Sequence, residues 1–205
     1  PQTGKGRPGR MKNAGAVSKT RVDSLIDLGQ RVQSRFPKFY LAGGTALMIR
    51  HRHRTSVDLD FFSEREFSFR SVETRMRNAF RVQRSAEFAD NLDLWIGGVK
   101  VSFVFFPYRN RKPLIRHSGI LMASDYDIFL NKLYAAGRRV DGKDPVDAAF
   151  LFNQNEWPLK MLKRDFEKKF PGQSWEIYLG ALLSFEDYPG LPPAVKKSLR
   201  RLLQG

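Results

Sequence analysis

Asp58 and Asp60 alternate with apolar residues in the segment 57–62, which reads VDLDFF. In an extended strand, residues two apart project from the same face, so both carboxylates are expected on one side of a sheet. Two neighbouring carboxylates repel each other unless a cation lies between them, and Mg²⁺ typically binds one or two protein carboxylates plus substrate phosphates. The spacing therefore predicts a site for Mg²⁺ (or Mn²⁺), although a pair of solvated aspartates would show the same short pattern.

A glycine pair precedes this acidic strand. Gly43 and Gly44 end a short apolar strand at residues 39–42, and Thr45 opens a predicted helix over residues 45–51. The free backbone amides at a helix N-terminus bind anions, with the helix dipole favouring negative charge. A Gly-Gly turn of this kind more often only connects a strand to a helix, without binding a ligand. Here it falls in the same strand–helix–strand unit as the paired acids, so a nucleoside triphosphate could lie across both.

The longer pattern resembles a known family. Residues 39–47 (FYLAGGTAL) and 54–63 (RTSVDLDFFS) closely resemble the signature of AbiEii/AbiGii-type nucleotidyltransferases of the DNA polymerase beta superfamily. These are the toxin halves of abortive-infection toxin–antitoxin pairs used in phage defence. Residues 127–133 (DIFLNKL) and 143–147 (KDPVD) resemble the downstream motifs in spacing and order. The resemblance spans residues 36–155, roughly, and the last fifty residues carry no motif that we can name.

The resemblance implies transfer of a nucleoside monophosphate from an NTP to an acceptor, with release of pyrophosphate. The glycine turn and its threonine would hold the triphosphate, an arginine and a serine before the acids would flank it, and the helical half would add a lysine and an aspartate. The implied catalytic residues are Asp58, Asp60, Lys132 and Asp147, the implied nucleotide-binding residues are Gly43, Gly44, Thr45, Arg54 and Ser56, and the implied metal ligands are Asp58 and Asp60.

The residues of the second half also have purely structural interpretations. Lys132 lies off the apolar stripe of its predicted helix and could be an ordinary surface lysine. Asp144 precedes Pro145 as a good helix N-cap, and Asp147 suits the third helical position, so capping explains both without chemistry. We favour capping for Asp144 and a site role for Asp147.

One position departs from the superfamily pattern. Many polymerase-beta-type enzymes place a third acid on a neighbouring strand, where Ser102 stands in this sequence. A serine cannot bind metal as a carboxylate does, and Asp93 on the adjacent predicted strand is a weak substitute. We therefore favour one metal ion held by two aspartates over two-metal catalysis. His51 and His53 lie among arginines whose charge opposes cation binding, so proximity to phosphate or solvent exposure is the better interpretation of both.

The elements that must position these residues form an α+β chain. We expect a helix at residues 21–35, the strands and helix named above, a helix at 69–80 capped by Ser68, and a hairpin of residues 92–96 and 99–106 across Gly97-Gly98. Helices then follow at 124–136, 144–152, 159–170, 175–185 and 194–203. The expected organisation is a disordered basic tail (1–19), a nucleotidyltransferase core with a polymerase-beta-type mixed sheet and flanking helices (20–122), and a helical C-terminal region that completes the active-site cleft (123–205).

The net charge and the composition indicate which kinds of partner the protein can have. The net charge of +15 favours polyanions, so RNA such as tRNA is the expected acceptor, beside an NTP and a cognate antitoxin. The sequence has no cysteine, which excludes thiol catalysis and Cys-based metal sites. The absence of a secretory signal and of a membrane-spanning apolar run favours a cytoplasmic protein with no membrane partner. Two other classes stay open: a non-catalytic basic nucleic-acid-binding module, and a degenerate fold that binds a nucleotide as a sensor.

Overall fold

The computed structural model describes residues 19–203. The basic tail predicted for residues 1–19 lies outside this range except for Lys19, which begins the first helix. In the described part of the chain, no helix is both long and apolar enough to cross a membrane.

The first half is a seven-stranded mixed sheet with three helices, in the strand order β3-β4-β5-β2-β1-β7-β6. Strand β2 lies near the middle, antiparallel to β1 and parallel to β5. The elements are α1 (Lys19–Arg35), β1 (Tyr40–Ala42), α2 (Gly43–His51), β2 (Leu59–Ser63), α3 (Phe69–Ala79), β3 (Val82–Glu87), β4 (Asn91–Ile96), β5 (Val99–Phe105), β6 (Ile115–His117) and β7 (Ile120–Met122).

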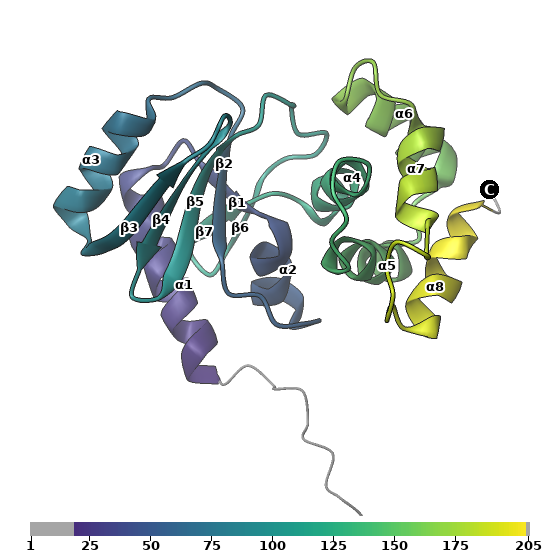
Figure 1. The fold of residues 1–205 in the computed structure, drawn as a ribbon, viewed down its shortest axis with the longest axis horizontal. Helices are drawn as coiled ribbons and strands as arrows, with labels where there is room; N and C mark the ends of the chain where they lie inside the picture. Colours follow the sequence, from purple (N-terminus) through teal and green to yellow (C-terminus); the bar gives the residue numbers. More distant parts are fainter. Residues whose placement is uncertain (1–18, 204–205) are drawn as a thin grey trace, which may run out of the picture.

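Up to residue 203, where the described part of the chain ends, the second half is built from helices and loops. It comprises α4 (Asp125–Ala136), α5 (Lys143–Asn155), α6 (Leu159–Lys169), α7 (Trp175–Leu183), α8 (Pro193–Arg200) and the 3₁₀ turn η1 (Arg201–Leu203). Figure 1 shows this bundle beside the sheet, with α4, α5 and α2 lying between the strands and the outer helices. The architecture is the mixed sheet with flanking helices, followed by a helical half, that the sequence predicts.

Alternation along the central strands separates a core face from a polar face. Leu41, Phe61, Phe103 and Leu92 pair in register across β1, β2, β5 and β4, and all four are fully buried. Phe36, which directly follows α1, packs edge-on against Phe103 with ring centroids 4.8 Å apart. The residues between these apolar positions therefore face the opposite side of the sheet, toward the helical half.

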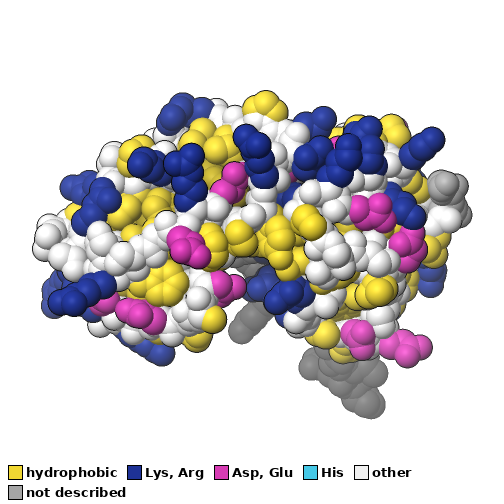
Figure 2. Space-filling model, turned by 90° about the horizontal axis from the view of Figure 1, so that it is seen from above, with side chains coloured by type: hydrophobic (Ala, Val, Ile, Leu, Met, Phe, Trp, Pro, Cys, Tyr) yellow, Lys and Arg dark blue, Asp and Glu magenta, His cyan; other side chains and the backbone are white. Residues whose placement is uncertain are grey.

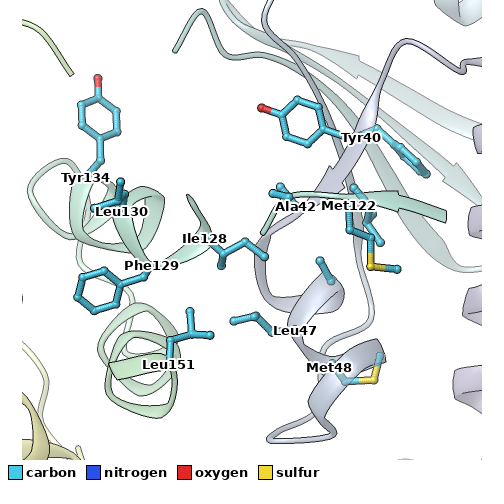
Figure 3. Close-up of a cluster of buried hydrophobic side chains, with 14 of the residues drawn as sticks. Tyr40, Ala42, Leu47, Met48, Met122, Ile128, Phe129, Leu130, Tyr134 and Leu151 are labelled. Atoms are coloured by element: carbon cyan, nitrogen blue, oxygen red, sulfur yellow. The ribbon is translucent and has the colours of Figure 1, made fainter. Parts of the chain in front are cut away.

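The two halves meet through an apolar contact that begins at α2. Leu47 of α2, Ile128 of α4 and Leu151 of α5 are fully buried and point toward one another (Figure 3). Buried aliphatic side chains of this kind contribute about 1.5–3 kcal/mol each. This packing fixes α4 and α5 against the helix that starts at the glycine turn.

Most predicted elements are present, with shifted ends. Ser68 caps α3 and Ser124 caps α4, each hydroxyl accepting a hydrogen bond from a backbone amide three residues on. The Gly97-Gly98 hairpin is confirmed, with both glycines at positive φ. The predicted start of a strand at residue 57 is wrong, because β2 begins at Leu59, and α2 begins at Gly43 instead of residue 45. Strands β3, β6 and β7 were not predicted.

Candidate active site

A pocket of about 500 Å³ opens between the polar face of the sheet and the helical half. Its floor comes from β2, β5 and β4, one wall from the start of α2, and the other from α4 and the loop before α5. The residues that line it include Gly43, Gly44, Arg54, Ser56, Asp58, Asp60, Asp93, Lys100, Ser102, Asn131, Lys132, Arg139, Lys143 and Asp144. Residues as far apart in the sequence as Gly43 and Asp144 thus line a single pocket.

The paired acids lie on the pocket floor. Asp60 belongs to β2 and Asp58 directly precedes that strand, and both side chains keep partial exposure. Burial raises the pKa of Asp60, and the nearby charge of Asp58 adds to the rise, while Lys100 and Lys132 oppose it. Burial therefore disfavours the charged form of Asp60 in the metal-free site, and a bound divalent cation would favour that form.

The turn before α2 approaches these acids closely. Gly43 has φ +71°, and a Cβ there would lie 3.1 Å from Oδ2 of Asp60. At Gly44 a Cβ would lie 2.4 Å from Nη2 of Arg54. The N-cap residue is Ala42, which offers no side-chain hydrogen bond to the first helical amides. The start of α2 is therefore uncapped and faces the pocket, as an anion-binding helix N-terminus requires.

Thr45 and Ser56 form a pair at the edge of this wall. The Thr45 hydroxyl is fully buried and donates to Oγ of Ser56 at 2.8 Å, and Ser56 in turn lines the pocket. The structure thus places Ser56 at the pocket and Thr45 behind it. Thr45 positions the serine and the first turn of α2.

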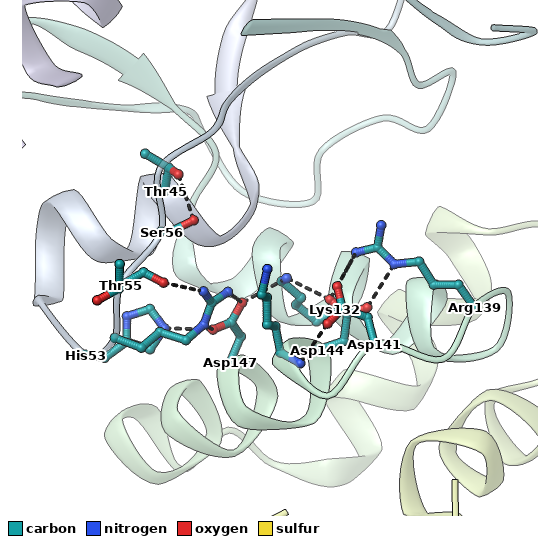
Figure 4. Close-up of polar contacts among 11 residues, drawn as sticks. Thr45, His53, Thr55, Ser56, Lys132, Arg139, Asp141, Asp144 and Asp147 are labelled. Carbon is teal, nitrogen blue, oxygen red and sulfur yellow. Dashed lines mark hydrogen bonds and ion pairs between the residues drawn. The ribbon is translucent and has the colours of Figure 1, made fainter. Parts of the chain in front are cut away.

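Arg54 bridges the halves through Asp147. Its Nε donates to Oδ1 of Asp147 at 2.5 Å and its Nη2 to Oδ2 at 2.6 Å, and His53 Nε2 lies 2.7 Å from Oδ1 (Figure 4). Burial alone would raise the pKa of Asp147, yet these hydrogen bonds and the charge of Lys132 hold it well below its usual value. Asp147 is therefore an ionised, buried carboxylate that binds Arg54 and His53 beside the pocket.

Lys132 joins the same network from α4. Its Nζ lies 2.7 Å from Oδ1 of Asp144 and 2.8 Å from Oδ2 of Asp147, and only 7% of the residue is exposed. It also lines the pocket, so it is not an ordinary surface lysine. Arg139 Nε binds the other oxygen of Asp144 at 3.1 Å.

The capping role favoured for Asp144 is wrong. Gly142 is the N-cap of α5, and no side chain caps this helix. Asp144 is fully buried and its carboxylate is used by Lys132 and Arg139, because the docking of α4 on α5 brings these cations to it. Asp147 is likewise committed to ion pairs and caps nothing.

The residues present fit a divalent cation. Asp58 and Asp60 offer hard oxygen ligands in an open pocket, and the buried Ser102 lies in register beside Asp60. Over residues 19–203, no group of three or more acids or histidines lies close enough to share an ion. A two-carboxylate set agrees with the coordination that Mg²⁺ commonly takes beside substrate phosphates.

His53 lies beside the pocket and binds Asp147, a contact that the sequence did not predict. Its side chain is 2% exposed, stacks on Phe150 with centroids 4.7 Å apart, and binds Asp147. The interpretation of this histidine as solvent-exposed is therefore wrong, and its proximity to phosphate stays a prediction. His51 also pairs with a carboxylate, that of Asp125, at 3.0 Å.

Comparison with known proteins shows the family to which this chain is similar. The family described as "Nucleotidyl transferase AbiEii toxin, Type IV TA system" matches residues 30–204. The Aquifex aeolicus (strain VF5) protein aq_aa25 is 38% identical over 157 residues, which cover 73% of this chain and 74% of that protein.

Solved structures share the fold at low sequence identity. JHP933 from Helicobacter pylori aligns with a TM-score of 0.56 and 16% identity over 91% of this chain and 90% of its own. MenT4, a nucleotidyltransferase toxin from Mycobacterium tuberculosis H37Rv, aligns with a TM-score of 0.53 and 14% identity over 90% of this chain and 85% of its own. With paired acids, an uncapped helix start and a buried lysine around one pocket, the chain belongs to the AbiEii nucleotidyltransferase toxin family of type IV toxin–antitoxin systems.

Proposed function

We propose that this nucleotidyltransferase transfers a nucleoside monophosphate from an NTP to RNA, with Mg²⁺ or Mn²⁺ held by Asp58 and Asp60. The observation that carries the proposal is the convergence on one pocket of these acids, the uncapped start of α2 and Lys132. These are the groups needed to bind a cation, a triphosphate and the charge that develops during transfer.

The chain's own groups would bind the triphosphate from two sides. The free amides of Gly43 and Gly44 face it from α2, and Ser56 adds a hydroxyl beside them. Lys100, Lys132 and Lys143 supply positive charge from the sheet and the helical half. When bound, the metal ion would neutralise phosphate oxygens and orient the α-phosphate.

The reaction is an in-line displacement at the α-phosphorus. An acceptor hydroxyl oxygen forms the new bond to phosphorus, the bond to the bridging oxygen breaks, and pyrophosphate leaves while the hydroxyl proton is released. Positioning supplies much of the rate, and effective molarities in well-oriented reactions reach on the order of 10⁵–10⁸ M. Lys132 would stabilise the added negative charge on the departing phosphates.

Asp147 would act through its neighbours. Its carboxylate holds Arg54 from the β2 side and Lys132 from α4 at the same time. Since Arg54 and Lys132 both line the pocket and both bind Oδ2 of Asp147, this aspartate keeps two neighbouring cations at fixed positions in the pocket wall. We therefore propose a positioning role for Asp147.

RNA is supported as acceptor by charge. The chain carries 36 Lys and Arg against 21 Asp and Glu. Figure 2 shows many Lys and Arg side chains along the upper edge of this face, from one end to the other, with acidic side chains scattered below them. Such a row of cations attracts a phosphate backbone.

Labelled nucleotides test the acceptor. The purified protein is incubated with Mg²⁺ and each α-³²P-labelled NTP in turn. The acceptor is either total bacterial RNA or total bacterial protein from which RNA has been removed, and each reaction is run with and without EDTA. We expect label in RNA only, from one NTP above the others, and none with EDTA. Label in protein alone would refute the RNA acceptor, and label that persists in EDTA would refute the metal.

Growth assays test the toxin in cells. Expression without an antitoxin should arrest a bacterial host, and Asp58→Ala should relieve the arrest because it removes a metal ligand. Asp23→Ala, an exposed acid on α1, is the matched control and should remain toxic. Equal arrest by Asp58→Ala would point instead to toxicity through plain binding of nucleic acid, the non-catalytic alternative.

A further inference from the structure

A row of side chains crosses the pocket floor perpendicular to the strands. The register pairs Ala42 of β1 with Asp60 of β2, Asp60 with Ser102 of β5, and Ser102 with Asp93 of β4. Residues paired across neighbouring strands project from the same face. Asp93 therefore faces the same side as Asp60, with one strand between them, and it lines the same pocket.

Asp93 is held in place through one oxygen, and its other oxygen faces a cation beyond hydrogen-bond distance. Asn91 donates from Nδ2 to its Oδ1 at 2.8 Å, and the nearest cation to Oδ2 is Lys100 Nζ at 3.9 Å, beyond hydrogen-bond distance. The Asp93 side chain is 12% exposed. A mostly buried carboxylate that is oriented through one oxygen, and whose other oxygen has a nearby cation but accepts no hydrogen bond from it, can accept a hydrogen bond from a ligand.

The position of Asp93 does not suit a shared metal ligand. Two strand spacings separate Asp60 from Asp93, roughly 10 Å between backbones. Within residues 19–203 no set of three acids or histidines is close enough to hold one ion. This separation leaves room for a cation at Asp60, a phosphoryl group on that cation and an attacking hydroxyl beyond it, since metal–oxygen distances are about 2.1 Å.

The other buried carboxylates around the pocket have partners. Asp144 is bound by Lys132 and Arg139, and Asp147 by Arg54, His53 and Lys132, as described above. Apart from Asp58 and Asp60, which would hold the metal ion, Asp93 is the buried acid of the described pocket whose second oxygen lacks a partner within hydrogen-bond distance.

We propose that Asp93 is a catalytic residue that binds the attacking hydroxyl of the acceptor through Oδ2 and takes its proton. The hydroxyl oxygen bonds to the α-phosphorus, its proton passes to Oδ2 of Asp93, and the bond to the bridging oxygen breaks with loss of pyrophosphate. Asn91 is a positioning residue that keeps Oδ1 occupied and so aims Oδ2 at the acceptor. This inference rests on the proposed function and adds the acceptor side of the site.

Asp93→Asn tests the proposal because it keeps the shape and removes the proton acceptor. General-base catalysis contributes typically about 10²–10⁴-fold, so we expect kcat for labelling of total bacterial RNA to fall by about that factor. KM for the NTP should not change. Calorimetric titration with a non-hydrolysable α,β-methylene NTP and Mn²⁺ should give wild-type affinity, which separates this role from metal binding.

Two further variants sharpen the test. Asn91→Leu leaves the carboxylate in place but removes the amide that orients it, and should lower kcat about tenfold, less than Asp93→Asn does. It also serves as the test if Asp93→Asn does not fold. Glu87→Gln, an exposed carboxylate on β3 of the same sheet, is the matched control and should keep wild-type kcat.

The outcomes separate the inference from the proposed function. A wild-type kcat in Asp93→Asn would overturn the role of Asp93. If that variant does not fold, a wild-type kcat in Asn91→Leu would overturn it instead. In either case, transfer to RNA by the wild type would still uphold the proposed function. A loss of Mn²⁺ and nucleotide affinity that accounts for the whole loss of rate would make Asp93 a ligand of the metal–nucleotide complex and would also overturn it. If the wild type transfers nothing to RNA with Mg²⁺, both proposals fail.

Discussion

Arg54 and Asp147 form a two-hydrogen-bond ion pair, with Nε–Oδ1 at 2.5 Å and Nη2–Oδ2 at 2.6 Å, that joins the two halves of the molecule. Arg54 lies before β2, close to the paired acids Asp58 and Asp60, whereas Asp147 lies on α5. The planar guanidinium matches both carboxylate oxygens, a geometry that lysine does not reproduce. The pair therefore sets the position of the helical half relative to the acidic strand.

Removing one partner of this pair should destabilise the protein. We expect Arg54→Met to lower the free energy of unfolding by about 3 kcal/mol, because a buried carboxylate loses its main counterion although His53 and Lys132 remain. Urea denaturation at neutral pH measures the change. The low pKa of Asp147 means that the pair's contribution is present above the ordinary aspartate pKa and is lost as the pH falls below it.

An exposed arginine–glutamate pair is the matched control for Arg54. Arg201 and Glu156 also join distant segments, at 3.3 Å, but their side chains are 46% and 73% exposed. Exposed pairs contribute about 0–1 kcal/mol, so Arg201→Met should have little effect. Similar losses in both variants would show that burial of the Arg54 pair is unimportant.

Asp60→Asn should stabilise the metal-free protein. Burial and the charge of Asp58 raise the pKa of Asp60, so the folded state favours its protonated form, and stability falls as the pH rises from the unfolded pKa through the folded pKa. The asparagine removes this penalty at neutral pH, and each kcal/mol gained should raise Tm by about 2–4 °C.

Thermal scans with and without Mg²⁺ would check the change at Asp60. Mg²⁺ should raise the Tm of the wild type more than that of Asp60→Asn, because binding to the native state adds stability. A metal-free variant that melts below the wild type at pH 7, or an equal response to Mg²⁺, would contradict the interpretation.

Gly43→Ala should damage both stability and transfer. A side chain at positive φ costs about 1–2 kcal/mol, and the new Cβ would lie 3.1 Å from Oδ2 of Asp60. Gly98→Ala, at φ +78° with open space around it, is the matched control and should lose similar stability but no activity. If transfer falls equally in both, backbone strain alone would explain the loss at Gly43.

Lys132→Met should lower kcat by about 10²–10³, with less effect on nucleotide affinity, because the lost charge acts mainly in the transition state. It should also destabilise the protein, because Asp144 and Asp147 lose a shared cation. The double variant Lys132→Met, Asp144→Asn should recover much of that stability and none of the activity. Recovery of transfer in the double variant would mean that Lys132 acts only through folding.

The fold could be predicted where periodicity is strong. The acidic strand, the Gly97-Gly98 hairpin and the two serine-capped helices follow from local rules, and each is present. The missed strands are short or polar and lie toward the sheet's edges: β3 and β6 are the edge strands, and β3 alternates weakly in burial. Edge strands bury little side-chain area, so their sequences carry little apolar signal.

The motif residues of the site could be predicted from the sequence, but the ion pairs and hydrogen bonds that connect them to the helical half could not. The carboxylate pair and the glycine turn are local in sequence, so their types and spacing indicate their position. The contacts of His53, Asp144 and Asp147 depend on how α5 docks beside the β2 loop, about ninety residues away for His53 and Asp147. A charged residue at a helix start resembles a cap until the partner helix supplies a counterion, which is why the prediction for Asp144 was wrong.

The central claim is that the paired acids and the start of α2 bind one metal–nucleotide complex. Crystals soaked with Mn²⁺ and the preferred α,β-methylene NTP test it most directly, through the anomalous peak of manganese and the density of the triphosphate. We expect manganese between Asp58 and Asp60, with the triphosphate reaching the amides of Gly43 and Gly44 and the ammonium of Lys132. Manganese bound away from both aspartates, or a triphosphate outside this pocket, would contradict the claim.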